Sequence, residues 1–267
     1  MKAFVVDLSI CNGCYCCQIS CKDEHVANDW TPYAAPQPDT GQFWVKVNEE
    51  IRGTVPKVKI SYAPMMCLHC DDAKCMKECS SGAISRRADG MIVIDPTKCV
   101  GCKLCPDTCP NGMIYFNENL NISQKCTGCS HLIDDNWDHP RCVDSCPTGA
   151  LKYGEESELQ ELIAKAEPLK AHHTSGRVYY LNVPKGFVAG TLYDPIEKEV
   201  LIGATCTLVE QGSNQTRTVE TDNFGDFWFK DLPREKREYT LTLEKDGKKK
   251  VIPVETTKDV NLGDIPM

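Results

Sequence analysis

Cysteine is the residue type with which this sequence could do chemistry. The chain has 267 residues and eighteen cysteines, and sixteen of these cysteines fall into four groups of four. Thiolate sulfur is a soft ligand that suits zinc and iron-sulfur clusters, so we expect all sixteen to bind metal. The groups are Cys11, Cys14, Cys17 and Cys21; Cys67, Cys70, Cys75 and Cys79; Cys99, Cys102, Cys105 and Cys109; and Cys126, Cys129, Cys142 and Cys146.

The first and third groups have the spacing Cys-x-x-Cys-x-x-Cys-x-x-x-Cys, and Cys109 is followed by Pro110. This is the run with which bacterial ferredoxins bind 4Fe-4S clusters. Three thiolates two residues apart surround one corner of a cubane, while the amides between them face its sulfides. The fourth cysteine starts a helix and serves the neighbouring cluster. Each group is therefore expected to donate three ligands to one cluster and one ligand to another.

The second and fourth groups are variants of this run. They have a longer loop between two of the ligands and keep the three-residue step before the last cysteine. Structural zinc sites also use pairs of Cys-x-x-Cys, but two such pairs leave the third cysteine of the first and third groups unexplained. We therefore predict four 4Fe-4S clusters, with zinc as the alternative. The chemistry implied is one-electron transfer.

Two cysteines lie outside this pattern, and both are interpreted as structural because free cysteine is often a small buried hydrophobe. Cys16 stands between two expected ligands, and Cys206 shares one face of a predicted strand with Ala204 and Leu208. Of the six histidines, His69 lies inside the second group and is a candidate for tuning a cluster. We find no acid-base pair, phosphate-binding loop or dinucleotide motif, so bond-making chemistry is expected on another chain.

The composition excludes several classes of partner. The formal net charge is -8, which disfavours nucleic acid because phosphate binding needs clustered Lys and Arg. The Lys248–Lys250 run follows Asp246-Gly247, a hairpin signal, so it is interpreted as a solvated turn. No apolar run reaches the roughly 18 residues of a membrane span. Met1–Ile10 is too short for an export signal, and we expect a cytoplasmic location.

Short apolar stretches flank the cysteine groups and predict the ferredoxin pattern of strand, ligand loop, short helix and strand. They are Ala3–Asp7, Met91–Asp95, Gly112–Phe116 and Gly149–Tyr153. The insert between the first two groups contains Trp30, Tyr33, Phe43 and Trp44, for which core packing is expected, and its prolines break regular structure. A helix is predicted over Leu159, Leu162, Ile163 and Ala166, with Ser157 as a possible cap.

From about Phe187 the pattern changes to two-residue alternation. Phe227 and Phe229 are expected on one face, as are Tyr239, Leu241 and Leu243 ahead of a hairpin turn. The predicted fold class is α+β, with two ferredoxin-like 4Fe-4S modules and a C-terminal all-β sandwich. The modules occupy residues 1–154, the second (about 60–120) being inserted in the first; a helix and linker occupy 155–186, and the sandwich occupies 187–267.

On these residues, the region 1–154 resembles the four-cluster electron-transfer subunits of the dimethyl sulfoxide reductase superfamily of molybdopterin enzymes. The resemblance implies that the first group pairs with the fourth and the second with the third. The implied ligand sets are Cys11, Cys14, Cys17 and Cys146; Cys21, Cys126, Cys129 and Cys142; Cys67, Cys70, Cys75 and Cys109; and Cys79, Cys99, Cys102 and Cys105.

The stretches Cys21–His25 and Gln124–Asp135, together with the appended sandwich, suggest a closer match. Residues 190–208 and 221–229 are similar to carboxypeptidase-regulatory-like domains. This combination resembles the small subunits of pyrogallol-phloroglucinol transhydroxylase and of related phenolic hydroxylases and dehydroxylases. An unbroken four-cluster relay fits a net reductase or hydroxylase at least as well as a closed transfer of hydroxyl, which consumes no net electrons.

The resemblance also implies partners. It implies a non-catalytic electron-transfer subunit bound to a large catalytic subunit that holds molybdenum or tungsten bis-molybdopterin guanine dinucleotide, with a redox donor protein as a further possible partner. Subunits of this superfamily are also exported bound to a signal-bearing large subunit, which makes the periplasm the alternative location. Two other functions stay open: a free-standing polyferredoxin, and the iron-sulfur subunit of another molybdopterin reductase.

Overall fold

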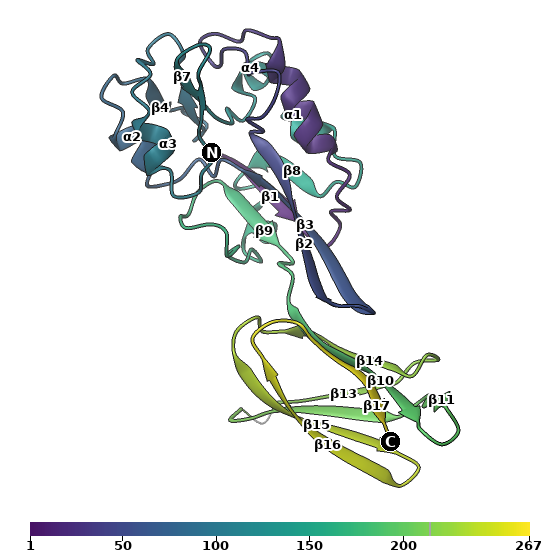
Figure 1. The fold of residues 1–267 in the computed structure, drawn as a ribbon. Helices are drawn as coiled ribbons and strands as arrows, with labels where there is room; N and C mark the ends of the chain where they lie inside the picture. Colours follow the sequence, from purple (N-terminus) through teal and green to yellow (C-terminus); the bar gives the residue numbers. More distant parts are fainter. Residues whose placement is uncertain (214) are drawn as a thin grey trace. The chain divides into compact units, whose positions relative to one another are not determined.

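The computed structural model describes residues 1–213 and 215–267. The chain forms two compact units (Figure 1). The cluster unit consists of Met1–Glu49 and Ser61–Val183 and contains the sixteen motif cysteines. The sandwich unit consists of Glu50–Ile60 and Pro184–Met267.

A three-stranded sheet forms the centre of the cluster unit. Its middle strand is β1 (Lys2–Asp7), which pairs antiparallel with β8 (Leu151–Glu155) and parallel with β9 (Val178–Leu181). All four residues of Ala3–Val6 are fully buried. An unbroken apolar run of this kind is expected for a strand that is covered on both faces.

Short helices and hairpins surround this sheet and carry the cysteine groups. Helix α1 (Cys16–Val26) packs against α5 (Arg141–Asp144), and α2 (Lys74–Lys77) packs against α3 (Leu104–Thr108). The hairpins are β4 (Ile84–Arg86) with β5 (Ile92–Ile94), and β6 (Tyr115–Asn117) with β7 (Ile122–Gln124). The remaining helices are α4 (Ser130–Asp134) and α6 (Gln160–Ile163).

Two apolar cores divide the cluster unit into modules. One core surrounds the central sheet and includes Phe4, Trp44 and Met91. The other is built on Ile84 and Ile94 of the β4–β5 hairpin. Each core also contains cysteines of the motif groups. This arrangement agrees with the prediction of two ferredoxin-like modules.

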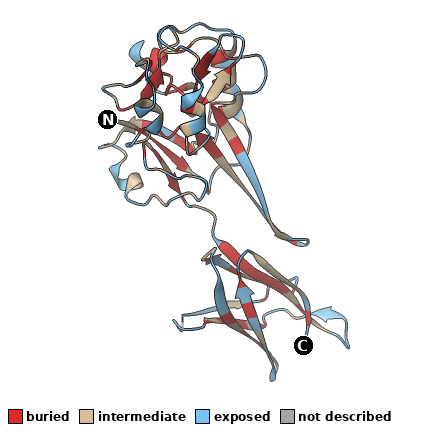
Figure 2. Cartoon of the chain, turned by 60° about the vertical axis from the view of Figure 1, so that its left-hand side comes forward, coloured by how far each residue is buried: buried red, intermediate tan, exposed pale blue. Residues whose placement is uncertain are grey.

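Two four-stranded sheets form the sandwich unit. One has the order β11-β10-β14, with β17 parallel to β10, and the other has the order β13-β12-β15-β16. Residues such as Leu208, Phe227 and Leu241 are at most 1% exposed. Buried residues alternate with more exposed ones along the strands (Figure 2). The strands are β10 (Gly186–Asp194), β11 (Glu199–Val200), β12 (Thr205–Glu210), β13 (Thr216–Glu220), β14 (Asp226–Leu232), β15 (Arg237–Lys245), β16 (Lys248–Thr256) and β17 (Val260–Pro266).

The predicted α+β fold class with a C-terminal sandwich is confirmed, and so are the packing predictions within the sandwich. Cys206, Phe229 and Leu243 are buried as the two-residue alternation predicted. Asp246 and Gly247 form the turn between β15 and β16. The lysines that follow this turn are largely solvent-exposed, and Lys249 pairs with Glu244 across it.

Three local features differ from the sequence predictions. The region expected to be irregular contains a long hairpin, β2 (Val45–Thr54) with β3 (Lys57–Met66). Helix α6 is one turn long, and Leu159 rather than Ser157 occupies its N-cap position. The region 155–186, expected to be a helix and linker, also contributes β9 to the central sheet, so the cluster unit extends to Val183.

Candidate metal centre

Each ligand loop needs a left-handed backbone just before its second cysteine. Glycine takes this position in three groups, and two of these glycines are Gly13 and Gly101, each with φ +70°. A Cβ atom there would lie 2.5 Å from the Tyr62 ring or from Asn121. His69 holds the same position in the second group, with φ 48°. The loops therefore curl back on themselves, which brings successive cysteines to one side.

Helix α1 extends from one ligand set to the next. It begins at Cys16, directly after the left-handed Tyr15, and it contains both Cys17 and Cys21. These two thiols are 6% and 5% exposed. We expected the helix to start at the fourth cysteine of the group, whereas it already contains the third. Because the two cysteines are four residues apart, they lie on the same face of the helix.

The first set is recognisable from the electrostatic influence of its thiols on one another. Burial, and then the neighbouring thiols of Cys11, Cys146 and Cys14, raise the pKa of Cys17 to about 12. Cys146 comes from the fourth sequence group, 129 residues after Cys17 in the chain. The structure thus brings these four cysteines together.

The second set is the most deeply buried. Burial raises the pKa of Cys129 to about 12, with a further contribution from Cys126. The pKa of Cys142 is also raised, first by burial and then by Cys129, Cys21 and Cys126. Cys21 is contributed by α1 and the other three cysteines by the fourth sequence group.

The third and fourth sets occupy the second module. Burial raises the pKa of Cys75 to about 11, and the thiols of Cys67, Cys109 and Cys70 act in the same direction. These four cysteines all line one cavity. The fourth set is centred on Cys105, whose pKa is raised by burial and then by its neighbours Cys99, Cys79 and Cys102.

The four sets that the structure brings together have the same members as the sets implied by the resemblance. The assignment of each cysteine as an iron ligand stays a prediction. Thiols with a pKa of 11 to 12 are protonated at neutral pH, so ligation must displace the proton. In residues 1–213 and 215–267, no three His, Cys, Asp or Glu side chains converge as ligands of one ion. A cubane has its irons at separate corners, so its thiolates lie farther apart than the ligands of a single ion.

Hydrogen bonds to sulfur support thiolate character in these loops. The backbone N–H groups of Met113, Ser123 and Gly128 donate to Cys109, Cys99 and Cys126, each at 3.4 Å. At Cys79, burial opposes ionisation, but hydrogen bonds from Ser81, Ile84 and Ala83 together lower the pKa. Cys146 behaves similarly, since donors in and after its loop outweigh burial and lower its pKa. These donors stabilise negative charge on sulfur, which suits the four-thiolate environment of a 4Fe-4S cluster.

The sets follow one another in a linear order. Cys17 of the first set influences Cys21 and Cys142 of the second. Cys67 of the third set influences Cys126 of the second. Cys75 and Cys109 of the third set pack against the same small core as Cys105 of the fourth. The four cysteine sets therefore follow one another in space in the order first, second, third and fourth.

Only the ends of this series have an exposed thiol among the described cysteines. Cys14 in the first set and Cys102 in the fourth are exposed, whereas the thiols of the two middle sets are buried or half-buried. Electron exchange with another molecule needs close approach, so the two outer sets are the accessible ones.

Comparison with known proteins places this arrangement in a family. Residues 58–156 match the family model of the 4Fe-4S dicluster domain, and residues 188–266 match the carboxypeptidase regulatory-like domain. The chain is 37% identical over 258 residues to the pyrogallol hydroxytransferase small subunit of Pelobacter acidigallici, with coverage of 91% of this chain and 90% of that protein. It is 32% identical to one polypeptide of the anaerobic dimethyl sulfoxide reductase of Escherichia coli, with coverage of 73% of this chain and 97% of that protein.

This protein belongs to the iron-sulfur subunits of the dimethyl sulfoxide reductase superfamily. Another relative is the arsenate respiratory reductase iron-sulfur subunit of Shewanella, at 29% identity and 66% coverage of this chain. Membership confirms the predicted family, the 4Fe-4S chemistry and the role as an electron-transfer subunit of an oxidoreductase.

One buried residue of this iron-sulfur subunit escaped the sequence analysis. Lys125 lies in a stretch that we used for the resemblance, yet it received no role of its own. It is 2% exposed and lines the cavity of the third set. Lys98 stands equally one residue before a motif cysteine, but its side chain is 62% exposed. The sequence offers no signal that separates the two lysines.

In the iron-sulfur subunit, Trp44 shares an apolar core with Cys21, Cys126 and Cys142 of the second set. His25 is buried and packs against Trp44 in a tilted arrangement and against His131 edge-on, with ring centroids 4.5 and 5.3 Å away. Burial, and then the neighbouring His131, lower the pKa of His25 to about 3, so its ring is neutral. Trp44 is 2% exposed and packs in the core, as the sequence predicted for the aromatics of the insert, whereas Trp30, Tyr33 and Phe43 are half-buried.

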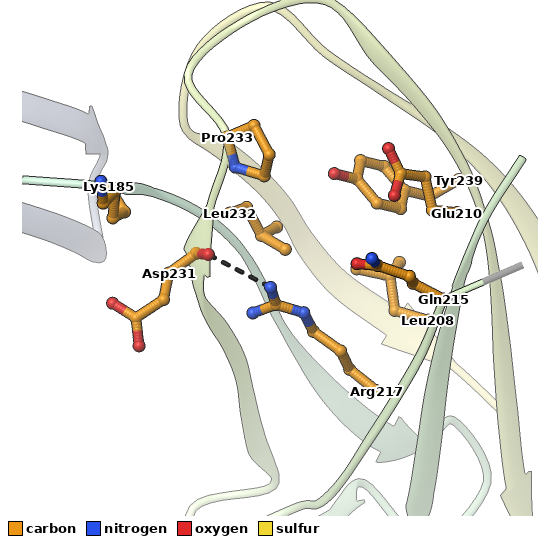
Figure 3. A pocket seen from close by; sticks show the side chains of 9 residues that line it. All are labelled: Lys185, Leu208, Glu210, Gln215, Arg217, Asp231, Leu232, Pro233 and Tyr239. Carbon is orange, nitrogen blue, oxygen red and sulfur yellow. Dashed lines mark hydrogen bonds between the residues drawn. The ribbon is translucent and has the colours of Figure 1, made fainter. Parts of the chain in front are cut away.

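The sandwich unit of the iron-sulfur subunit has a hollow of a different kind (Figure 3). The Arg217 guanidinium donates to the backbone oxygens of Lys230 and Asp231 at 2.7 and 3.2 Å. Glu210 pairs with Arg237 at 3.2 Å. Two of its charged side chains, Arg217 and Glu210, are thus engaged by the chain itself. The lining residues are Lys185, Leu208, Glu210, Gln215, Arg217, Asp231, Leu232, Pro233 and Tyr239.

None of the helices formed by residues 1–213 and 215–267 is long and apolar enough to cross a membrane. The longest, α1, has 11 residues and ends at Val26.

Proposed function

We propose that this subunit holds four 4Fe-4S clusters and relays electrons to or from a large catalytic subunit that contains molybdenum or tungsten bis-molybdopterin guanine dinucleotide. We further propose that the complex acts on phenolic aromatic compounds, as a transhydroxylase, hydroxylase or dehydroxylase. The sixteen ligands proposed are the four cysteine sets described above.

One observation carries the proposal: sixteen cysteines distant in sequence gather into four sets of four that follow one another in space. Each set combines three cysteines of one group with a single cysteine of its partner group, such as Cys146 in the first set and Cys109 in the third. This interlocking is expected for ferredoxin-type pairs of clusters. Zinc would need four cysteines per ion and would not require the interlocked order.

The chain's own residues would supply the environment, and the bound clusters would supply one-electron redox steps. Backbone amides such as those of Met113 and Ser123 direct N–H groups at ligand sulfurs. All four cysteines of the second set are buried, and three of them share an apolar core with Trp44, which excludes water from the middle of the series. Exposed Cys14 and Cys102 mark the two ends at which electrons would enter and leave.

The phenolic substrate class is supported by the similarity to the Pelobacter subunit. That similarity covers 91% of this chain, including the sandwich unit, whereas similarity to the dimethyl sulfoxide reductase polypeptide covers 73%. The second candidate is the iron-sulfur subunit of a reductase with another substrate. It is favoured by the four complete cysteine sets, because a relay of this length suits a reaction with net electron flow.

Anaerobic co-purification tests the proposed function. The tagged chain, expressed with its genomic neighbours, should carry with it a large subunit that contains molybdenum or tungsten and pterin. The complex should convert a hydroxylated benzene such as pyrogallol, and it should exchange electrons with a viologen dye. A chain that purifies alone and reduces several unrelated enzymes would instead be a polyferredoxin. Conversion of sulfoxides or arsenate, but no phenol, would favour the second candidate.

The cellular location belongs to the proposal as well. We propose the cytoplasm, with the periplasm as the alternative if the large subunit has an export signal and carries this chain with it. Fractionation of anaerobically grown cells, with antibodies against both subunits, decides between the two compartments.

A further inference from the structure

Lys125 is a buried cation without a carboxylate partner. Its side chain is 2% exposed, and its ammonium donates to the backbone oxygens of Ile92 and Cys126, the latter at 2.9 Å. None of the Asp and Glu side chains in residues 1–213 and 215–267 forms an ion pair with it. Burying an unpaired ammonium costs several kcal/mol. A negative charge is therefore expected beside it.

Lys125 contacts two different ligand sets. Its ammonium donates to the backbone oxygen of Cys126, a member of the second set, at 2.9 Å. Its side chain also lines the cavity formed by the third set. Cys67 of the third set and Cys126 of the second pack in the same apolar core, so the two sets are neighbours here. Lys125 thus lies at the junction between the two middle sets.

Other polar groups at this junction do not balance the charge. His69 is fully buried, and its Nδ1 accepts the N–H of Ile92 at 2.9 Å, which leaves the ring neutral. Arg86 is nearer the surface and donates to the backbone oxygens of Cys70 and Gly90. Four thiolates make each cluster a net anion, and these anions fit the unbalanced ammonium.

We propose that Lys125 is a charge-tuning residue whose ammonium, placed between the second and third cysteine sets, raises the reduction potentials of both middle clusters together. This inference rests on the proposed function. Reduction adds a negative charge, and a cation in a poorly solvated interior stabilises the reduced form. The two middle clusters are thereby held at higher potential than they would have with a neutral neighbour.

The test is a redox titration of the full chain, followed by electron paramagnetic resonance, in Lys125→Met and in a matched control, Lys98→Met. Both lysines precede a motif cysteine, but Lys98 is exposed and pairs with Asp95 at 3.0 Å. In Lys125→Met, two of the four midpoint potentials should fall by at least about 59 mV, which is a tenfold change in a one-electron equilibrium. In Lys98→Met, all four should stay in place, because solvent screens that charge.

Two further variants separate charge from structure. Lys125→Arg retains the charge and should restore the potentials, whereas Lys125→Gln retains hydrogen-bond donors without the charge and should lower them. Wild-type potentials in the Gln or Met variant would overturn the inference, as would loss of clusters from the Gln variant, because the role assigned here is electrostatic. A wild-type chain without clusters would instead refute the proposed function.

Discussion

At the scale of single residues, a cysteine belongs to a ligand set if its sulfur lies close to the sulfurs of the other members. Cys16 and Cys17 are adjacent in sequence and illustrate the difference. Cys17 is 6% exposed and lies with Cys11 and Cys146, whereas Cys16 is exposed at the start of α1. Successive residues of a helix point about 100° apart, so only one of the two can face the set.

We expect Cys17→Ser to remove or convert one cluster, because a serine hydroxyl is a poor ligand for iron beside three thiolates. Anaerobic iron analysis should show a loss of up to about four of roughly sixteen irons per chain. Cys16→Ser is the matched control and should retain the full iron content. Equal losses in both variants would contradict the assignment of Cys17, and loss in Cys16→Ser alone would exchange their roles.

At the scale of elements, the short ligand loops position the cysteines, and the long β2–β3 hairpin contributes residues to both units. The loops depend on left-handed residues, and Gly13 is held against the Tyr62 ring of β3. The outer part of the β2–β3 hairpin belongs to the sandwich unit. There Arg52 forms an ion pair with Asp259 at 3.0 Å, and both side chains are less than 10% exposed.

Gly13→Ala tests the loop geometry against Gly112→Ala. Both glycines have positive φ, +70° and +60°, so both variants incur a similar backbone strain of about 1 kcal/mol. Only at position 13 would the new methyl group lie 2.5 Å from Tyr62, while nothing lies within 4 Å at position 112. We expect Gly13→Ala to lose the cluster of the first set, as measured by iron content and paramagnetic resonance. Identical spectra of the two variants would disprove this account of the loop.

Arg52→Ala tests the anchoring of the hairpin in the sandwich unit. Removing Arg52 leaves Asp259 buried, with the N–H of Phe187 at 2.9 Å as its remaining donor, so we expect a loss of about 3 kcal/mol. Denaturant unfolding followed by the fluorescence of Trp228 reports on this unit. Lys236→Ala breaks the exposed pair with Glu255 and should cause no measurable loss. A stable Arg52→Ala chain would show that the pair contributes little.

At the scale of the whole molecule, the sequence predicted the features that depend on the spacing of residues close together in the chain. Cysteine spacing predicted that each group divides its ligands three to one between two sets, and the family resemblance implied which groups pair, as the structure brings them together. Two-residue alternation predicted the burial of Cys206 and Phe229. The β2–β3 hairpin was missed because its outer residues are stabilised by partners far along the chain, such as Asp259. Strand β9 was missed because its pairing with β1 joins residues about 170 positions apart. Lys125 was missed because burial is a tertiary property.

The most direct test of the account is the count of iron and acid-labile sulfide in the anaerobically purified chain, combined with paramagnetic resonance after reduction. Four 4Fe-4S clusters predict about sixteen irons and about sixteen sulfides per chain, with spectra of four interacting clusters. A chain with zinc in place of iron, or with iron for only one or two clusters while all sixteen cysteines are intact, would contradict it.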